Sequence, residues 1–242
     1  LGGQPLTSDD VQELLVREYG FKRIESWSKD GLSDIEVGAK YQYLNSKNWR
    51  LAFTAGVILP TGDVDDPDNL VDRGFGSGAY APFLYLQHDY MGFRNLLLNL
   101  TLKYKLYLPD HEELRVPENP NRPITANKER VDRDLGDVFE AEVECQYRFT
   151  DWLSGFALYK YGQRLKDRIS GDGGFNYEAL EHETNATQHV AKIGLTYSTI
   201  SLYKEKKFPL PMTVSISYRN RFAGSNNVLK SEYIGLGVSV YF

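Results

Sequence analysis

Residues 138–149 read VFEAEVECQYRF, and the strict alternation in this stretch decides the fold class. The odd-numbered positions from 139 onward are apolar or aromatic, whereas positions 140, 142 and 144 are all glutamate. Successive side chains of a β-strand point to opposite faces, so a period of two predicts a strand with one apolar and one charged face. The stretch exceeds the roughly five or six residues of most soluble strands. Its length suits a tilted crossing of a membrane.

The same alternation recurs on both sides of this stretch. Even-numbered positions 96 to 102 are all leucine, for example, and they lie opposite Asn99, Thr101 and Lys103. Repeated alternation of this kind predicts an all-β, antiparallel fold. The expected strands, about nine in number, are 33–44, 49–59, 79–90, 93–108, 138–149, 153–166, 187–199, 212–222 and 230–242.

The connections between these strands differ in length in a regular way. Short turns at one rim and long loops at the other are typical of outer-membrane barrels. The short connections are 45–48, 91–92 and 150–152, and the long, polar ones are 60–78, 109–135 and 167–186. The alternation is imperfect, because 200–209 is longer than a minimal turn and 223–228 is shorter than the other outer loops.

Aromatic residues gather near the expected strand ends, as the aromatic girdles of membrane barrels do. Near the short turns are Tyr43, Trp49, Phe93, Phe149, Trp152 and Phe242; towards the long loops are Tyr107, Tyr159, Tyr161 and Phe222. The last strand ends on Phe242, the terminal aromatic expected of such barrels. We therefore expect the C-terminus and the short turns in the periplasm, the long loops outside the cell, and contact between the last strand and the barrel-assembly machinery.

Composition excludes several classes of protein. A mean hydropathy of -0.45 and a charged fraction of 25% leave no run of apolar residues long enough for a membrane helix, although alternating strands also score as polar. The net charge of -5 argues against a nucleic-acid partner, which requires a basic face. The single cysteine, Cys145, excludes an intramolecular disulfide and lies on the apolar face of its strand as a small hydrophobic residue.

Motifs of enzymes are missing from the sequence. There is no G-x-S-x-G, H-E-x-x-H or C-x-x-C pattern, so we expect neither catalytic residues nor a cofactor. Some barrels carry a His–Ser pair for lipid hydrolysis on the outer wall. Here His189 is expected to point outward near Thr187, with no serine at strand spacing.

The polar faces of the strands carry charges of both signs. Glu140, Glu142 and Glu144 are expected to face Lys160 and Arg164 on the next strand, either as packing in a closed interior or as a transverse field that orients a solute. The excess of basic residues on these faces favours anionic solutes. The predicted lumen-lining residues are Glu36, Lys40, Arg50, Lys103, Lys105, Glu140, Glu142, Glu144, Arg148, Lys160, Arg164, Lys192, Arg219 and Arg221.

The outer loop 61–72, TGDVDDPDNLVD, is rich in carboxylates. Oxygen ligands of this kind bind hard cations such as Ca²⁺, which makes Asp63, Asp65, Asp66 and Asp68 candidate ligands. The loop lacks the glycine and glutamate spacing of an EF-hand. A solvated acidic loop, with no metal, is the favoured interpretation.

The first 30 residues do not resemble a strand. Ser8, Asp9 and Asp10 form an N-cap and an acidic first turn, an apolar stripe follows, and Gly20 can end the helix. This helix is expected in an outer loop, or else as a plug inside the barrel. Because a bacterial barrel has an even number of strands, we expect at least one further strand from residues 1–31 or from sequence upstream of Leu1.

Three short stretches carry a family resemblance: GLSDIEVGAKYQ at 31–42, LPTGD at 59–63 and FGSGAY at 75–80. Together they resemble the outer-membrane channel family of the MetA pathway of phenol degradation, whose members are often labelled simply transporters. The resemblance is specific over residues 31–90 and is a matter of alternation thereafter. It implies a barrel of about twelve strands, where the strand count gives ten to twelve, and uptake of small molecules that include aromatic ones. It supplies no catalytic or substrate-binding residues.

The sequence thus predicts a single transmembrane β-barrel domain over residues 1–242, in contact with outer-membrane lipid and lipopolysaccharide. The expected function is a channel for passive uptake of small aromatic or anionic solutes. The alternative is a closed structural barrel whose long loops bind a protein partner, an envelope polymer or a cation. A soluble β-protein, such as a sandwich or a lipocalin-like barrel, conflicts with the strand lengths and with the placement of the aromatics.

Overall fold

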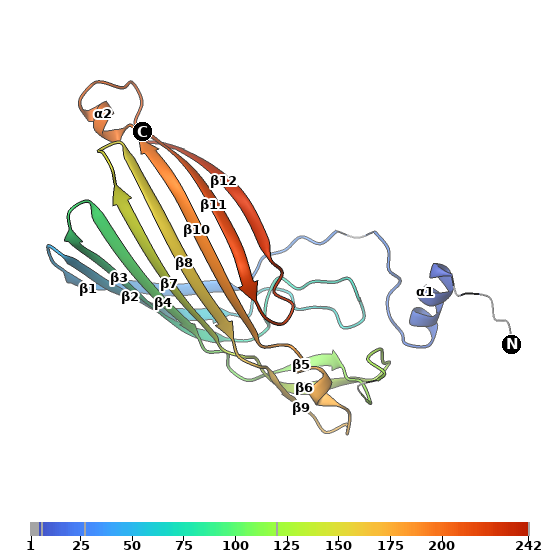
Figure 1. The fold of residues 1–242 in the computed structure, drawn as a ribbon. Helices are drawn as coiled ribbons and strands as arrows, with labels where there is room; N and C mark the ends of the chain where they lie inside the picture. The colour runs from blue at the N-terminus through green and yellow to red at the C-terminus, as the bar shows by residue number, and fades with distance from the viewer. Residues whose placement is uncertain (1–4, 6, 27, 120, 242) are drawn as a thin grey trace.

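The computed structural model describes residues 5, 7–26, 28–119 and 121–241. A nine-stranded antiparallel sheet dominates it, with strand order β1-β2-β3-β4-β7-β8-β10-β11-β12 (Figure 1). Its strands are β1 Ile35–Asn45, β2 Trp49–Leu59, β3 Ala81–Phe93, β4 Leu96–Lys105, β7 Val138–Arg148, β8 Leu153–Arg164, β10 Ala186–Ser198, β11 Met212–Gly224 and β12 Ser231–Val240.

All nine strands expected from the alternation are confirmed, and each boundary agrees within three residues. One turn was misplaced: β3 continues to Phe93, so the chain reverses at 94–95 rather than at 91–92. Asn95 has φ 62°, a left-handed conformation that asparagine tolerates better than most residues. Phe242, the predicted terminal aromatic, lies outside the described residues.

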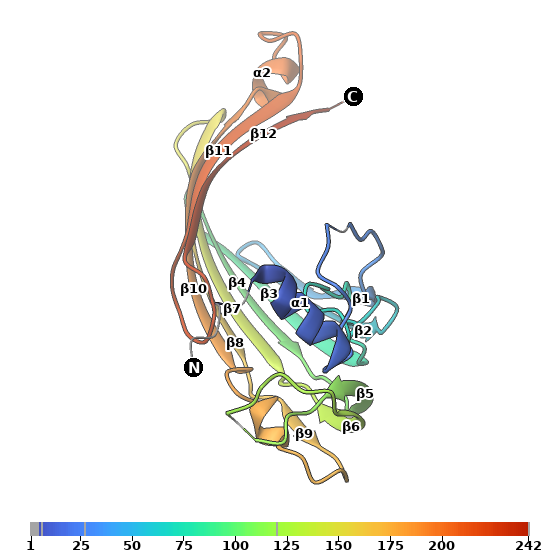
Figure 2. The ribbon, with the colours of Figure 1, turned by 90° about the vertical axis from the view of Figure 1, so that its right-hand side faces the viewer.

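The prediction of a closed barrel is wrong for the structure as it stands, because the sheet is open along β1 and β12. Antiparallel neighbours alternate in direction, so the first and ninth strands of the sheet run the same way. The two edges therefore cannot pair with each other in an antiparallel ladder. The sheet is nevertheless strongly curved, and Figure 2 shows it as an arc around an open concavity.

A second sheet of three strands was not predicted, since its residues were expected to be loop. It consists of β5 Asp110–Arg115, β6 Lys128–Asp134 and β9 Arg168–Ser170. Val116, Val131 and Ile169 form its buried core, with Phe175 and Tyr177 packed against them. The connection before β10 adds the 3-10 helix η1, Tyr177–Ala179. The two longest loops thus fold into a small layer at one end of the large sheet (Figure 1).

Helix α1 spans Ser8–Arg17 and ends near Gly20, which has φ 69° as its predicted helix-ending role requires. Its N-cap is Thr7 rather than Ser8, in a reciprocal capping box with Asp10. Figure 1 shows α1 beyond the strand ends on the long-loop side, and Figure 2 shows it in line with the concavity of the sheet. A one-turn helix, α2 Ile200–Lys204, lies at the opposite end. In the described part of the chain, no helix has the length and apolar character needed to cross a membrane.

Exposure in the large sheet is the reverse of that in a soluble protein. Ile234 and Leu236 are 73% and 75% exposed, whereas the side chains of Glu140 and Glu142 are only 21% exposed. Charged side chains are ordinarily the most exposed. The apolar face is therefore the outer one, and the charged face is the face that curvature encloses.

Candidate functional site

All fourteen residues predicted to line a lumen fall on one face of the large sheet. The pairing register decides this, since partners across a ladder share a face. One row, for example, joins Lys103 to Glu140, and the next joins Glu142 to Lys160. We call this face the concave face; it carries Glu36, Lys40, Arg50, Lys103, Lys105, Glu140, Glu142, Glu144, Arg148, Lys160, Arg164, Lys192, Arg219 and Arg221.

An ion pair across three strand spacings shows that this face is concave. Lys105 Nζ of β4 lies 3.6 Å from Glu36 Oε2 of β1. Neighbouring strands are about 4.8 Å apart, so the two backbones are separated by roughly 14 Å in a flat sheet. Tyr85 of β3 also donates to Glu36, at 3.2 Å. The side chains converge because the sheet bends towards them.

The centre of the concave face carries a group of four charges that neutralise one another. Lys103 Nζ lies 3.1 Å from Glu142 Oε1, and Lys160 Nζ lies 2.5 Å from Glu140 Oε1. The remaining cross pairs, Lys103–Glu140 and Lys160–Glu142, are both 3.7 Å. The opposite charges that the sequence places on adjacent strands are thus brought together here.

The β10–β11 side of the concave face carries basic residues that form no close ion pair within the described chain. Lys192 and Arg219 are direct cross-strand partners, and Arg221 lies two residues further along β11. Within the described chain, none of these three forms an ion pair with a carboxylate. Lys192 lies over the ring of Phe156 at 5.4 Å, and Arg219 over the ring of Tyr233 at 5.3 Å. Like charges opposite each other are unfavourable, so this side of the face holds cations at a cost in stability.

The three stretches that carry the family resemblance meet at the long-loop end of β1, β2 and β3. The carboxylate of Asp34 accepts hydrogen bonds from Gly62 N at 3.0 Å and from Ser77 N and Oγ at 2.7 and 2.9 Å. A Cβ on Gly62 would come within 2.8 Å of the Gly76 backbone, which explains both glycines. Burial opposes ionisation of Asp34, but the bonds from Ser77 and Gly62 outweigh it and hold its pKa below the usual range. Each motif therefore supplies one part of a single hydrogen-bonded cluster around Asp34.

Beyond this cluster, α1, loop 61–78 and the small sheet form a unit that we call the cap. Arg115 of β5, whose side chain is 9% exposed, holds it together through its guanidinium. It donates to the carbonyls of Tyr19, Gly20, Pro67 and Thr125 at 2.6 to 3.0 Å, and to the Asp68 carboxylate at 2.6 Å. The ring of Phe21 lies 3.9 Å from the guanidinium carbon. No local sequence pattern predicts this contact.

The acidic loop supplies the carboxylates that secure the cap. Lys22 pairs with Asp66, Lys29 with Asp72 at 3.0 Å, and Lys128 with Asp68 at 3.0 Å. The hydrogen bond from Lys22 lowers the pKa of Asp66. Burial would raise the pKa of Asp68, but Lys128 and Arg115 together lower it. The loop sequence favoured free, solvated carboxylates, but Asp66, Asp68 and Asp72 are each paired with a cation of the cap.

The four candidate metal ligands do not converge. Asp65 accepts from the backbone N of Gly74, whereas Asp66 and Asp68 are occupied by the cations of the cap. Asp63 contributes its backbone carbonyl to Phe75 and Gly76. Among the described residues, no group of three or more acidic, histidine or cysteine side chains could hold a metal ion.

The sequence model of one protein family matches this chain over residues 3–199. That family is described as "Putative MetA-pathway of phenol degradation". The chain belongs to this family. The resemblance inferred from the three motifs is thereby confirmed, and the match extends well beyond them.

Comparison with solved structures gives a related fold. The chain resembles the COG4313 outer membrane channel from Pseudomonas putida F1, with a TM-score of 0.55 and 14% sequence identity over 86% of this chain and 67% of that one. At this identity the likeness concerns the fold: a curved antiparallel sheet with long loops at one end. Comparison with curated proteins found no match.

Proposed function

We propose that this chain forms the wall of an outer-membrane channel through which small molecules pass passively, and that it is not an enzyme. The inverted exposure of the large sheet carries this proposal. An apolar outer face suits the hydrocarbon of a bilayer, and a charged concave face suits a polar lumen. In water, so much exposed apolar area would favour association instead.

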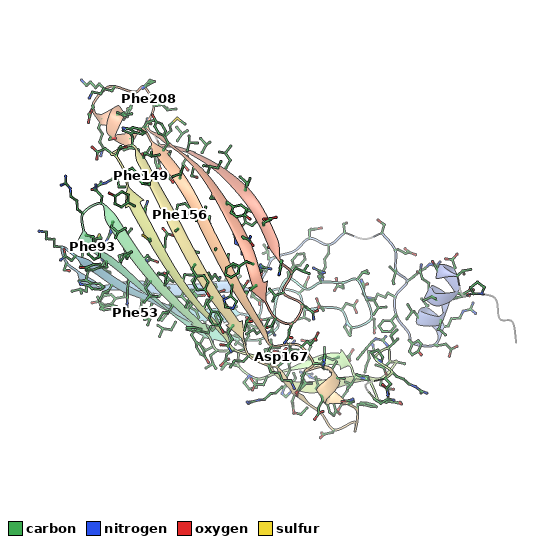
Figure 3. All side chains as sticks on the ribbon, in the orientation of Figure 1. Phe53, Phe93, Phe149, Phe156, Asp167 and Phe208 are labelled. Carbon is green, nitrogen blue, oxygen red and sulfur yellow. The ribbon has the colours of Figure 1, made fainter. Side chains whose placement is uncertain are left out.

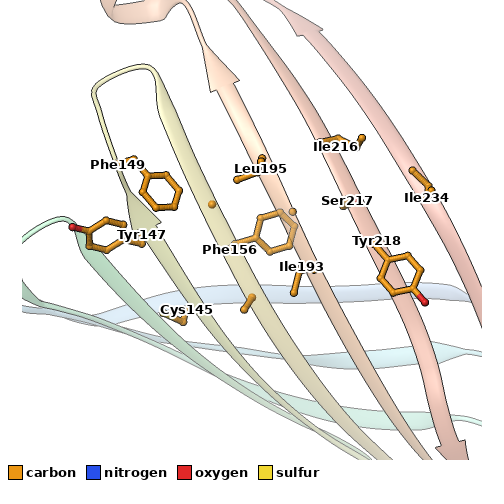
Figure 4. Close-up of a pocket in the computed structure, with 13 residues that line it drawn as sticks. Cys145, Tyr147, Phe149, Phe156, Ile193, Leu195, Ile216, Ser217, Tyr218 and Ile234 are labelled. Atoms are coloured by element: carbon orange, nitrogen blue, oxygen red, sulfur yellow. The ribbon is translucent and has the colours of Figure 1, made fainter.

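The outer face also has a shape that suits lipid. An apolar groove of about 530 Å³ crosses β7, β8, β10, β11 and β12 there (Figure 4). It is hollow because Cys145, Gly155 and Ala157 are small, while Phe149, Leu195 and Ile216 form its sides. We propose that acyl chains of outer-membrane lipid or lipopolysaccharide fill it.

Aromatic pairs mark the short-turn rim of the wall as one membrane interface. At the short-turn rim, Trp49 contacts Tyr90 with ring centroids 4.5 Å apart, and Trp152 contacts Tyr197 at 5.7 Å. Figure 3 places Phe93 and Phe149 towards the same rim and Asp167 at the other. We propose that this rim, with the C-terminus, faces the periplasm and that the cap faces outward.

Closure of the barrel requires further strands. Since β1 and β12 run in the same direction, an odd number of additional strands must join them, which gives an even total of ten or twelve. The edge of β12, at the end of the nine-stranded sheet, is the surface that the barrel-assembly machinery would recognise. We propose that residues 1–242 belong to a single domain, with α1 as an outer-loop element.

The lumen of so small a barrel is narrow, and the cap lies across it. The phenol-degradation family favours small aromatic solutes, and the unpaired cations of β10 and β11 favour anionic ones. A closed barrel that binds a partner through its loops is the second candidate, because Arg115 holds α1 in line with the concavity (Figure 2).

Conductance separates the two candidates. Purified full-length protein in planar bilayers should give discrete openings, and these should become more frequent when the cap is released by Arg115→Ala. Proteoliposomes should swell faster in phenol or benzoate than in a sugar of similar size. Silence of both the wild type and the Arg115→Ala variant at all voltages and salts would instead favour the closed barrel.

A further inference from the structure

Two arginines of the concave face share a cavity near its long-loop end. The cavity has a volume of about 230 Å³, and its lining includes Arg164 of β8, Arg221 of β11, Gln188 of β10 and Glu140 of β7. Val138 and Val228 supply apolar surface. A water molecule occupies about 30 Å³ of liquid, so the cavity has room for roughly seven waters or for one small organic molecule.

Both guanidinium groups are incompletely satisfied. In the described part of the chain only four buried side-chain N or O atoms lack a hydrogen-bond partner, and two of them are the Nε atoms of Arg164 and Arg221. Both residues line this one cavity. A buried donor without an acceptor calls for a specific explanation, such as a ligand or an ion. An anion held between the two arginines would supply such acceptors.

The neighbouring carboxylates do not compensate both cations. Glu140 is held by Lys160 at 2.5 Å, and Asp167 accepts from Arg164 Nη2 at 2.9 Å. Among the described residues, the Arg221 side chain makes one weak hydrogen bond, from Nη1 to the carbonyl of Leu229 at 3.4 Å. The cavity therefore keeps a positive charge, and Arg219 and Lys192 extend that charge deeper along the concave face.

The surroundings also select among anions. Planar guanidinium groups match the planar oxygens of a carboxylate. The two valines suit an apolar body attached to that carboxylate, which a free phosphate or halide lacks. Glu140 and Asp167 disfavour a second negative charge. These features together describe the ligand as an organic monocarboxylate.

We propose that Arg164, Arg221 and Gln188 form a binding site for the carboxylate of a small apolar monoacid at the entrance of the concave face. The proposal rests on the channel function, since it assigns one class of solute to that path. Arg221 is the principal ligand because, among the residues that the structure describes, no carboxylate pairs with its guanidinium, while Asp167 already orients Arg164.

Binding is measured directly on the full-length protein in detergent, by isothermal titration calorimetry with benzoate as the probe. Benzyl alcohol tests the apolar body without the charge, and inorganic phosphate tests the charge without the body. Arg221→Gln and Arg164→Gln should each weaken benzoate binding at least tenfold, and Arg221→Lys should restore part of it. Arg168→Gln, at an arginine of β9 whose side chain is 84% exposed, is the matched control and should bind as the wild type does.

Several results would overturn the site. These are the absence of saturable benzoate binding to the wild type, equal affinity in the Arg221→Gln variant, or binding of benzyl alcohol or phosphate as tight as that of benzoate. If Arg164→Gln fails to fold, because Asp167 also caps Gly136 N, Arg221→Gln and Arg221→Lys still decide the question. Benzoate binding without conductance would support the binding site and contradict the channel function. Conductance without benzoate binding would support the channel function and contradict the binding site.

Discussion

Replacing Arg115 with alanine should detach the cap while leaving the large sheet intact. The side chain is 9% exposed and bonds four backbone carbonyls and the Asp68 carboxylate. Removing one partner of a buried ion pair typically costs about 3–5 kcal/mol. Since about 1.4 kcal/mol is a factor of ten, the closed cap should be disfavoured by roughly two to three and a half orders of magnitude. None of the lost contacts involves the nine-stranded sheet.

Hydrogen exchange measured by mass spectrometry checks this prediction. Peptides covering 7–26 and 61–78 should lose protection in Arg115→Ala, whereas peptides of β7, β8 and β10 should exchange as in the wild type. Arg23→Ala is the matched control, because its pair with Asp9 is exposed and worth at most about 1 kcal/mol. Unchanged protection of α1 and loop 61–78 in Arg115→Ala, or an equal loss in Arg23→Ala, would refute the assignment of Arg115 as the latch.

Three further predictions concern the cap, the concave face and the outer face. The pKa values of Asp66, Asp68 and Asp72 are lowered in the folded cap. Their contribution to the stability of the cap is therefore fully present above the usual carboxyl pKa of about 3.9 and is lost as pH falls below it. Exchange protection of 61–78, corrected for intrinsic rate, should be constant from pH 8 to 5 and fall only under about pH 4; a loss already near pH 6 would contradict this. Charge reversal by Glu140→Lys with Glu142→Lys should shift the reversal potential in a salt gradient towards anion selectivity. The control Glu205→Lys, beside α2 outside the concave face, should not shift it. An equal shift in the double variant and in the control would place the ion path elsewhere. Leu236→Arg on the outer face should lower stability in lipid vesicles by about 2–4 kcal/mol, measured by urea unfolding, and Ser215→Arg on the concave face by much less; equal losses would contradict the assignment of the two faces.

The strands and their faces could be predicted because the signal is local. In 138–149 each residue's face follows from its neighbours, and the register of the structure only had to preserve that alternation. The fourteen charged residues fall on one face for the same reason. Whether that face encloses a lumen is a matter of closure, which depends on strands paired to the edges of the sheet.

The remaining features depend on contacts between distant residues. Arg115 bonds a carbonyl 96 positions away, and β6 pairs with β9 although the whole of β7 and β8 lies between them in the sequence. The strands β5 and β6 are short and densely charged, so their sequences show no clear apolar alternation and resembled a polar loop. Arg164 and Arg221 were placed on the right face, but their common cavity depends on Gly162 and on the position of Gln188.

The assignment of the two faces can be tested at a single pair of adjacent residues. Cys145 is exposed on the outer face, and Gln146 follows it on the concave face. In lipid vesicles, a small fluorophore on Cys145 should be quenched by brominated acyl chains and not by aqueous iodide. The same fluorophore on Gln146→Cys, in a Cys145→Ser background, should show the opposite preference. Lipid quenching at both positions, or iodide quenching at both, would contradict a wall with hydrocarbon on one side and a polar path on the other.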